Sequence, residues 1–350
     1  MLNMFIRNSW YVAAWSHEVG PTPVGRTLLD EPVCLFRGPS GEVAAFEDRC
    51  PHRAAPLSLG RVEDGQLRCM YHGLKFATSG NCVEIPGQDR IPSRMCVRTY
   101  RVVEKNNWVW IWMGALEDAD LAQIPDTWSL GSSAWAFKEG YYHYRAPHML
   151  ICDNLLDFSH LAYVHPTTLG GTENIAKGKP VVKPQSGGVR VERWLLDEVP
   201  APFHSRVSHF PSRVDRWHFY DFLVPGILIM HSGVQATGTG APDGHYVNAL
   251  EFRSCQAVTP ETSNSSHYFY AVPRNFSIDD KEITNKIFED VVAAFTEDKL
   301  IIEAQAARLG SDNDFHKLVA IGADVGLTQF RRLMSARLHA EAEVSARATE

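Results

Sequence analysis

The N-terminal third of the chain alternates short apolar runs with turn residues, a pattern typical of a small β domain. Stretches rich in aromatic and β-branched residues occur at 43–46, 66–69 and 108–112. Turn sequences containing glycine, proline or asparagine separate them, as at 38–41 and 79–81. We therefore expect short antiparallel strands up to about residue 113. Acidic and proline-containing segments then interrupt the pattern and predict a domain boundary between 115 and 135.

The rest of the chain mixes helical and strand-like patterns, so the fold class predicted for the whole chain is α+β. Helices are expected over residues 149–163 and over roughly 280–309. The strand-like runs are 222–229, 246–257 and 267–272. Residues 166–190 hold five glycines and three prolines. This loop-rich segment is a candidate lid over a site.

Composition narrows the functional class without identifying it. Hydrophobic residues make up 45% and charged residues 21% of the 350 positions, as in ordinary globular proteins. A net charge of −7 argues against nucleic acid as a partner. The sequence contains no apolar run of the length that a membrane helix needs, and residues 1–7 lack the features of a signal peptide. Seven scattered cysteines fit a reducing compartment, so we expect a cytoplasmic protein.

The most informative residues are two cysteines and two histidines in two short loops. Cys50 and His52 have one residue between them, sixteen residues follow, and then come Cys69 and His72. A Rieske [2Fe–2S] cluster needs two cysteines on one iron and two histidines on the other. The alternative is a Cys2His2 zinc site, but paired zinc ligands are usually separated by two to four residues. The spacing therefore favours the cluster.

A second metal site is indicated near residue 160. On a continuous helix Asn154, Asp157 and His160 advance by about 60° per step and share one side. His165 would point roughly 140° away from His160 on that helix. The proline at 166 disfavours helical backbone at His165, so we expect the helix to stop and the chain to turn back. The alternative is a pair of histidines without a metal.

The hydrophobic periodicity of residues 283–302 indicates a third ligand. Apolar residues at 287, 291, 295 and 302 form one helical stripe, and Asp298 lies within it, about 20° from Val291. A carboxylate facing a core is costly unless it is paired or binds a metal. Glu297 should point away and be solvated. Two histidines and one carboxylate make the facial triad of non-haem Fe(II) oxygenases. The alternative for Asp298 is a buried salt bridge.

These motifs resemble those of the Rieske aromatic-ring-hydroxylating oxygenases, most closely the vanillate and dicamba O-demethylase branch. The resemblance rests on 50–53 and 69–74, on Asp157-x-x-His160-x4-His165, on Glu297-Asp298, and on segments 259–262 and 274–280. It implies a Rieske domain over 1–120 and a helix-grip-like catalytic domain over 121–350. The cofactors implied are one [2Fe–2S] cluster and one mononuclear Fe(II) per chain. It also implies a homotrimer, in which Asp157 links His72 of a neighbour to His160 and Asn154 lies near the iron.

The resemblance implies an oxygenase that uses O2 to demethylate or dealkylate a small aromatic compound, releasing formaldehyde or another small aldehyde. The sequence has neither a dinucleotide fingerprint nor a second cysteine cluster, so electrons should come from NADH through a separate reductase or ferredoxin. Hydroxylation of a ring or methyl group is an alternative, and so is a Rieske electron-transfer protein without catalysis. Polar residues expected near the substrate are His231, Asn248 and Gln256.

Overall fold

The computed structural model describes residues 5–170, 172–208, 210, 213–310 and 318–347. The chain divides into two compact units. The first contains Met1–Asp126 and Thr259–Ser263, and the second contains Thr127–Val258 and Asn264–Glu350. The chain thus returns once to the first unit, where the Leu29 amide donates to the Pro260 carbonyl over 3.0 Å.

The first unit holds a six-stranded antiparallel sheet of order β1-β10-β9-β4-β3-β2 and a four-stranded one of order β5-β6-β7-β8. Its strands are β1 Trp10–Trp15, β2 Val24–Leu28, β3 Glu31–Arg37, β4 Val43–Glu47, β5 Arg61–Glu63, β6 Gln66–Arg68, β7 Lys75–Phe76, β8 Cys82–Glu84, β9 Thr99–Lys105 and β10 Trp108–Trp112. The expected strands at 43–46, 66–69 and 108–112 are thereby confirmed to within a residue.

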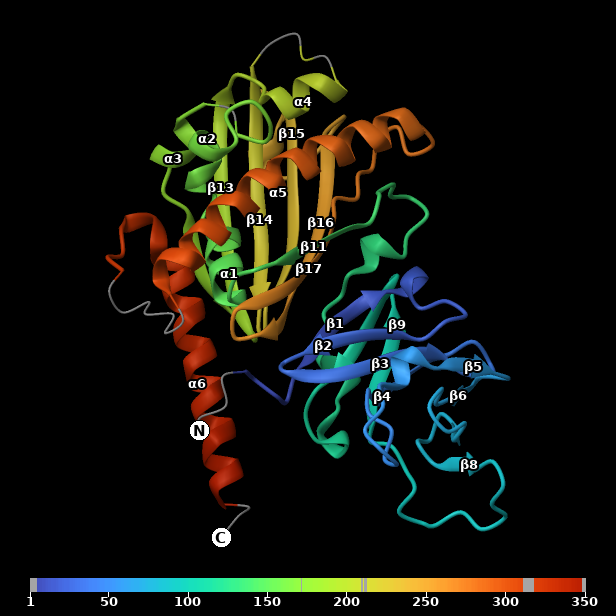
Figure 1. Cartoon of the computed structure of the whole chain (residues 1–350). Helices are drawn as coiled ribbons and strands as arrows, with labels where there is room; N and C mark the ends of the chain where they lie inside the picture. Colours follow the sequence, from blue (N-terminus) through green and yellow to red (C-terminus); the bar gives the residue numbers. More distant parts are fainter. Residues whose placement is uncertain (1–4, 171, 209, 211–212, 311–317, 348–350) are drawn as a thin grey trace. The chain divides into compact units, whose positions relative to one another are not determined.

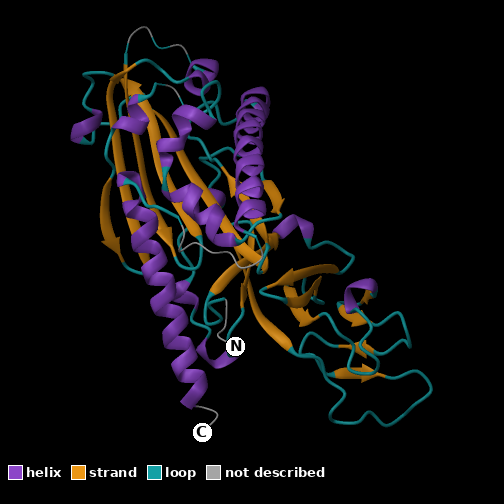
Figure 2. Cartoon of the chain, turned by 60° about the vertical axis from the view of Figure 1, so that its left-hand side comes forward, coloured by secondary structure: helices purple, strands orange, loops and turns teal. Residues whose placement is uncertain are grey.

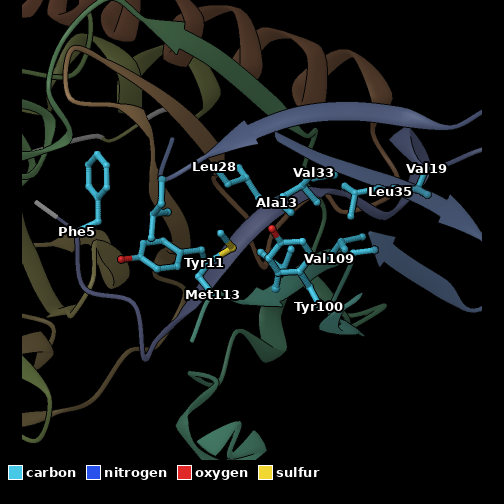
Figure 3. Close-up of a cluster of buried hydrophobic side chains, with 14 residues drawn as sticks. Phe5, Tyr11, Ala13, Val19, Leu28, Val33, Leu35, Tyr100, Val109 and Met113 are labelled. Atoms are coloured by element: carbon cyan, nitrogen blue, oxygen red, sulfur yellow. The ribbon is translucent and has the colours of Figure 1, made fainter. Parts of the chain in front are cut away.

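Side chains of the six-stranded sheet alternate between two cores because successive residues of a strand face opposite sides. In β3, Val33 and Leu35 enter one core with Tyr11 and Val109 (Figure 3). Cys34 and Phe36 enter the other core. That second core also contains Cys50 and Cys69, so the two cysteines are anchored against packed apolar side chains.

The second unit is built on a seven-stranded sheet of order β11-β17-β16-β15-β14-β13-β12. Its strands are β11 Gly140–Tyr144, β12 Val181–Gln185, β13 Gly188–Glu198, β14 Val214–Leu223, β15 Ile227–Ala236, β16 Leu250–Thr262 and β17 Ser265–Ala271. Its helices are α1 His148–Leu156, α2 Leu161–Val164, α3 Asn174–Lys177, α4 Pro202–Val207, α5 Lys281–Leu309 and α6 Val325–Arg347. Helix α5 lies across one face of this sheet (Figures 1 and 2). Antiparallel sheets with flanking helices confirm the α+β class.

The long helix α5 begins and packs as its sequence predicts. The Asp280 carboxylate caps it by accepting from the amides of Glu282 and Ile283, over 2.9 and 3.0 Å. Its buried stripe includes Val291, Phe295 and Asp298. The aspartate therefore does face the interior of the unit.

The prediction of one continuous helix over 149–163 is wrong. The segment is three pieces: α1, the 3₁₀ turn Phe158–His160, and α2. Asp157 has extended backbone, with φ −124° and ψ 104°, and its carboxylate accepts from the Ser159 amide over 2.8 Å. An aspartate that caps a new turn ends the preceding helix, because its side chain replaces the missing backbone partner. The predicted stop before Pro166 is confirmed, since His165 is already non-helical.

Two other segments differ from the sequence patterns. The run 222–229 is not one strand: β14 ends at Leu223, and a turn containing Pro225 and Gly226 leads into β15. The loop-rich segment 166–190 contains α3, the edge strand β12 and the beginning of β13. Gly171 of that segment lies outside the described residues.

Candidate metal centres and substrate cavity

The two cysteine loops of the first unit have the same backbone design. In each loop the cysteine amide donates to the carbonyl five residues on, Ala55 for Cys50 and Leu74 for Cys69, both over 2.8 Å. In each, the amide of the residue four positions after the cysteine donates back to the cysteine carbonyl. That residue has positive φ, 54° at Ala54 and 75° at Gly73. Such tight turns hold the side chains between these residues on one side.

The loops place thiols inside and imidazoles outside. Cys50 and Cys69 are 2% and 1% exposed, whereas His52 and His72 are exposed, with ring centroids 4.5 Å apart. Burial raises the pKa of the Cys50 thiol to about 11, and its contact with Cys69 adds to this. Within the described chain neither imidazole forms a hydrogen bond. Two paired thiols and two free imidazoles fit the donor set of a Rieske cluster.

In the second unit, His160, His165 and Asp298 converge from three elements. One ligand atom from each lies within 4.8 Å of the other two. Asp298 Oδ1 is 3.1 Å from His165 Nε2 and 3.4 Å from His160 Nε2. In the described chain Asp298 pairs with neither a lysine nor an arginine. The structure therefore does not support the alternative in which Asp298 forms a buried salt bridge with such a residue. The donor set is that of a non-haem iron facial triad.

Hydrogen bonds from outside the triad fix both rings. His160 Nδ1 contacts the carbonyl of Asp157, and His165 Nδ1 lies 2.7 Å from Glu297 Oε2. A carbonyl or carboxylate oxygen can only accept, so Nδ1 carries the proton in both rings and Nε2 is free to bind a metal. Glu297 is partly solvated, as expected, with its side chain 37% exposed, but its carboxylate also orients His165, which was not predicted.

Burial and charge act in opposite directions at the two histidines. Burial lowers the pKa of His160, and the nearby Asp298 only partly offsets this. Burial also disfavours charge on His165, but hydrogen bonds to Asp298 and Glu297 outweigh it and raise the pKa of this imidazole. The Asp298 carboxylate accepts a further hydrogen bond, over 2.9 Å, from Asn154 Nδ2. Asn154 therefore lies against the triad.

Asp157 uses its backbone and its side chain for different contacts. The carbonyl contacts His160, while carboxylate Oδ2 accepts from the Ser159 hydroxyl over 2.6 Å. Asp157 also lines an open groove of about 760 Å³ on the outer side of the triad, together with Asn154, His160 and Asp298. The remaining lining of this groove comes mainly from α1, α5, α6 and residues 318–320.

On the inner side, the triad meets a cavity of about 90 Å³. The cavity lies against one face of the sheet, since its lining residues alternate along β14, β15 and β16. They include Arg216 and His218, Met230 and Ser232, and Phe252, Ser254 and Gln256. The helices contribute Leu155, Leu161, Phe203, Val291 and Phe295. A mainly apolar cavity with a few polar groups suits a small aromatic molecule.

Of the three residues expected near the substrate, only Gln256 lines this cavity, and its Oε1 accepts from the Tyr268 hydroxyl over 2.7 Å. His231 lies on the opposite face of the sheet, where Nε2 is 2.8 Å from Glu251 Oε2. It stands between Met230 and Ser232, which both line the cavity, so strand alternation turns it away. Asn248 is exposed in a turn, with φ 58°.

Three buried polar residues of the cavity wall were not predicted from the sequence: Arg216, His204 and His218. Two of them, Arg216 and His218, have the two-residue spacing of one strand face, within the run 214–223. This was the one available signal. His204 comes from α4, and its position could not be inferred from spacing alone.

Comparison with known proteins defines the class. A Rieske [2Fe-2S] domain model matches residues 9–101, and the vanillate O-demethylase oxygenase C-terminal domain matches residues 144–340. The protein is therefore a Rieske-type oxygenase, with a [2Fe–2S] cluster and a mononuclear iron as its cofactors. It belongs to the family of the vanillate O-demethylase oxygenase components. Because the C-terminal half matches an oxygenase domain, the alternative of a Rieske electron-transfer protein without catalysis is excluded.

Individual relatives support this membership over nearly the full length. The iron-sulfur subunit of the toluene-4-sulfonate monooxygenase system of Comamonas testosteroni is 48% identical and covers 97% of this chain and 98% of its own. The vanillate O-demethylase oxygenase subunit of Pseudomonas sp. is 34% identical, with 98% and 97% covered. Dicamba monooxygenase bound to 3,6-dichlorosalicylic acid superimposes with a TM-score of 0.91 at 32% identity, covering 97% and 99%. In the described part of the chain no helix combines the length and hydrophobicity required to cross a bilayer.

Proposed function

We propose that this chain is the terminal oxygenase of a multicomponent monooxygenase that oxidises an alkyl C–H bond of a small aromatic compound, with dealkylation as the main outcome. The observation that carries the proposal is the position of His160, His165 and Asp298 at the wall of a mainly apolar cavity. Electrons come from NADH through a separate reductase or ferredoxin. The described residues include all seven cysteines and no disulfide, which supports a reducing, cytoplasmic location.

In this proposal Cys50, Cys69, His52 and His72 hold the cluster, and His160, His165 and Asp298 hold the iron. When bound, the iron activates O2 and the cluster supplies electrons one at a time. The chain's own residues do the rest. Glu297 and the Asp157 carbonyl orient the two imidazoles.

The cavity walls determine which part of the substrate reaches the triad. Leu155, Leu161 and Phe295 exclude water from the aromatic ring, and Gln256 offers a polar group on the sheet side. Closing an apolar site around the ring confines the reacting carbon and limits side reactions. A hydroxylated O-methyl carbon is a hemiacetal, which collapses to a phenol and formaldehyde. An N-methyl carbon gives the amine and formaldehyde in the same way.

A substrate panel tests the reaction type. We expect methoxy- or N-alkyl-substituted aromatics, supplied with O2, NADH and a surrogate reductase, to yield formaldehyde or a small aldehyde in proportion to O2 consumed. The control is the same panel with tert-butoxy aromatics, which have no hydrogen on the carbon attached to oxygen. Aldehyde release from the control, or none from the whole panel together with O2 consumption, would contradict dealkylation.

Hydroxylation of a methyl group is the second candidate. It is favoured by the 48% identical relative, whose name refers to toluene-4-sulfonate, a compound with a methyl group and neither O- nor N-alkyl groups. Both reactions begin at an alkyl C–H bond beside an aromatic ring, so the same cavity can serve both. Methylarenes included in the panel distinguish them, because hydroxylation gives a benzyl alcohol and no aldehyde is released.

We further propose that the active form is a homotrimer in which the cluster of one subunit serves the iron of the next. Two features support this. The cluster histidines are exposed, together with Met70 and Tyr71, which are 51% and 60% exposed. The open groove beside the triad presents the Asp157 carboxylate, which can accept a hydrogen bond from an imidazole of a neighbour. Asp157 would then couple the partner's cluster to His160.

Asp157→Asn should separate iron binding from electron delivery. The His160 ring is held by the backbone carbonyl of residue 157, which the substitution keeps, so the mononuclear iron should be retained. The loss of charge should slow oxidation of the reduced cluster by about 10-fold or more. The measurement is cluster reoxidation by absorbance in a single turnover with substrate and O2.

The matched control for Asp157→Asn is Ser159→Ala. This substitution keeps the Asp157 carboxylate but removes the hydroxyl group that donates a hydrogen bond to it. It should reoxidise at close to the wild-type rate. Reoxidation at the wild-type rate in Asp157→Asn would contradict the coupling role. Loss of iron from that variant would mean that the side chain, not the carbonyl, supports His160.

A further inference from the structure

The cavity has a polar wall, and several of its buried hydrogen-bonding atoms have no partner in the described chain. Arg216 and His218 come from β14 and His204 from α4. Their side chains are buried, at 3%, 8% and 5% exposure. Arg216 and His218 both act electrostatically on His204, so the three groups lie close together.

These three residues have too few partners for their burial. Arg216 Nη1 donates to the Gly170 carbonyl over 2.8 Å and Nη2 to the Leu169 carbonyl over 3.3 Å, but its Nε has no partner. Among the described residues, both ring nitrogens of His218 and Nδ1 of His204 also lack partners. Buried polar groups are almost always hydrogen-bonded, because leaving one unpaired is costly. A group of four such atoms at one wall of a cavity points to a bound polar ligand.

The wall is positively charged. Burial lowers the pKa of Arg216 only to about 10, so the guanidinium stays charged at neutral pH. Burial lowers the pKa of both histidines well below the usual value, so both rings are neutral. Each neutral ring has one N–H to donate. A second buried guanidinium, Arg193, lies across the strand pair from His218.

One carboxylate acts on Arg216 without forming an ion pair with it in the described chain. Glu198 is close enough to favour the charged guanidinium, but its oxygens accept from Thr172 Oγ1 and Asn174 Nδ2, both over 2.7 Å. Arg216 forms no ion pair in the described chain. A buried cation without an ion-pair partner is less stable than a paired one, so an anion that enters the cavity gains affinity here.

We propose that Arg216, His204 and His218 bind the anionic group of the substrate, so that the substrates are aromatic sulfonates or carboxylates whose alkyl group faces the iron triad. This inference rests on the proposed function and adds the substrate class to it. The guanidinium of Arg216 offers Nε and its remaining N–H groups to two oxygens of the anion. The 48% identical relative, named for an arenesulfonate, is consistent with this. Binding at this wall fixes which end of the ring approaches the iron.

Arg216 could instead serve only to hold the loop after His165, and a second arginine makes that alternative testable. Arg206 on α4 donates to the carbonyl of Thr167 in the same loop over 3.2 Å and pairs with Asp290 over 2.8 Å. It does not line the cavity. Arg206→Gln therefore removes a similar tie to the loop without changing the cavity wall.

The experiment measures binding to the holoenzyme by calorimetry, with two isosteric pairs of probes. One pair is toluene-4-sulfonate and toluene-4-sulfonamide, and the other is 4-methoxybenzoate and 4-methoxybenzamide. In the wild type we expect an anion to bind at least about 30-fold more tightly than its neutral partner. Arg216→Gln should remove most of that ratio because the anion binds more weakly. The affinity for the neutral probe should change by less than about threefold. Arg216→Lys should retain part of it.

The two pairs distinguish a sulfonate site from a carboxylate site by which anion shows the larger ratio. Arg206→Gln should leave both ratios as in the wild type. Equal binding of anionic and neutral probes by the wild type would overturn the proposal, and this result needs no variant to fold. If Arg216→Gln weakened the binding of both probes equally, or if Arg206→Gln lowered the anion-to-neutral ratio as much as Arg216→Gln does, Arg216 would serve only to hold the loop after His165. Turnover is measured separately, so anion binding without product contradicts the proposed reaction and not this site.

Discussion

Asp298→Ala is expected to remove the mononuclear iron and abolish turnover while leaving the cluster intact. Asp298 Oδ1 is the point at which both Nε2 atoms converge, 3.1 Å from His165 and 3.4 Å from His160. Without it the site has two neutral donors and lacks the anion that holds Fe(II). Iron should fall from about three to about two per chain, with an unchanged Rieske EPR signal. Iron analysis and EPR on the same sample make the measurement.

Two further substitutions on α5 sharpen the result for Asp298. Glu297→Gln keeps a hydrogen-bond acceptor for His165 but loses the charge, so iron affinity should fall by about 10- to 100-fold without being abolished. Glu289→Ala, at an exposed position of the same helix, should change nothing. Full iron content in Asp298→Ala, or a greater loss in Glu297→Gln, would show that Glu297 is the ligand and that the proposed triad is wrong.

His72→Cys is expected to lower the reduction potential of the cluster on the order of 100 mV or more. A thiolate adds negative charge to one iron, and all-cysteine plant-type clusters lie near about −400 mV, below the Rieske range. The exposed position of His72 means that the substituted side chain meets no steric barrier. An EPR-monitored redox titration measures the shift. The reductase should then reduce the cluster less completely, and turnover should fall.

Tyr71→Phe is the control for the cluster prediction. The Tyr71 ring contacts His72, with centroids 4.0 Å apart, and phenylalanine keeps that ring. Its potential should stay close to the wild-type value. An unchanged or higher potential in a His72→Cys protein that retains its cluster would contradict His72 as a ligand.

The cluster loops could be predicted because everything they need is local. Each loop closes on itself within five residues of its cysteine, and the glycine at 73 marks the positive φ that closure requires. The direction of Asp298 could be predicted for a related reason. An α-helix has a fixed period, so one carboxylate in an apolar stripe must face the interior. Within a single regular element, spacing determines direction.

The same helical period gave a wrong prediction where a capping side chain ends the helix. The segment 149–163 has a helical pattern, yet Asp157 caps a new turn and breaks it. Asn154, Asp157 and His160 therefore do not share one side of a continuous helix as predicted, although His160 belongs to the triad and Asn154 contacts it. Glu297 points away from the apolar stripe, as its spacing requires. The chain turn at His165 then brings an imidazole to it.

The sequence by itself determined the class of cofactors, the donor residues proposed for them and the α+β class, because each depends on short spacings or on the period of one element. Only the tertiary structure decided the substrate cavity. His231 is polar and lies on a strand, but one position of alternation puts it on the opposite face of the sheet. Arg216 and His218 meet His204 across long separations in the chain. No local pattern specifies such a meeting, since it depends on how helices pack against the sheet.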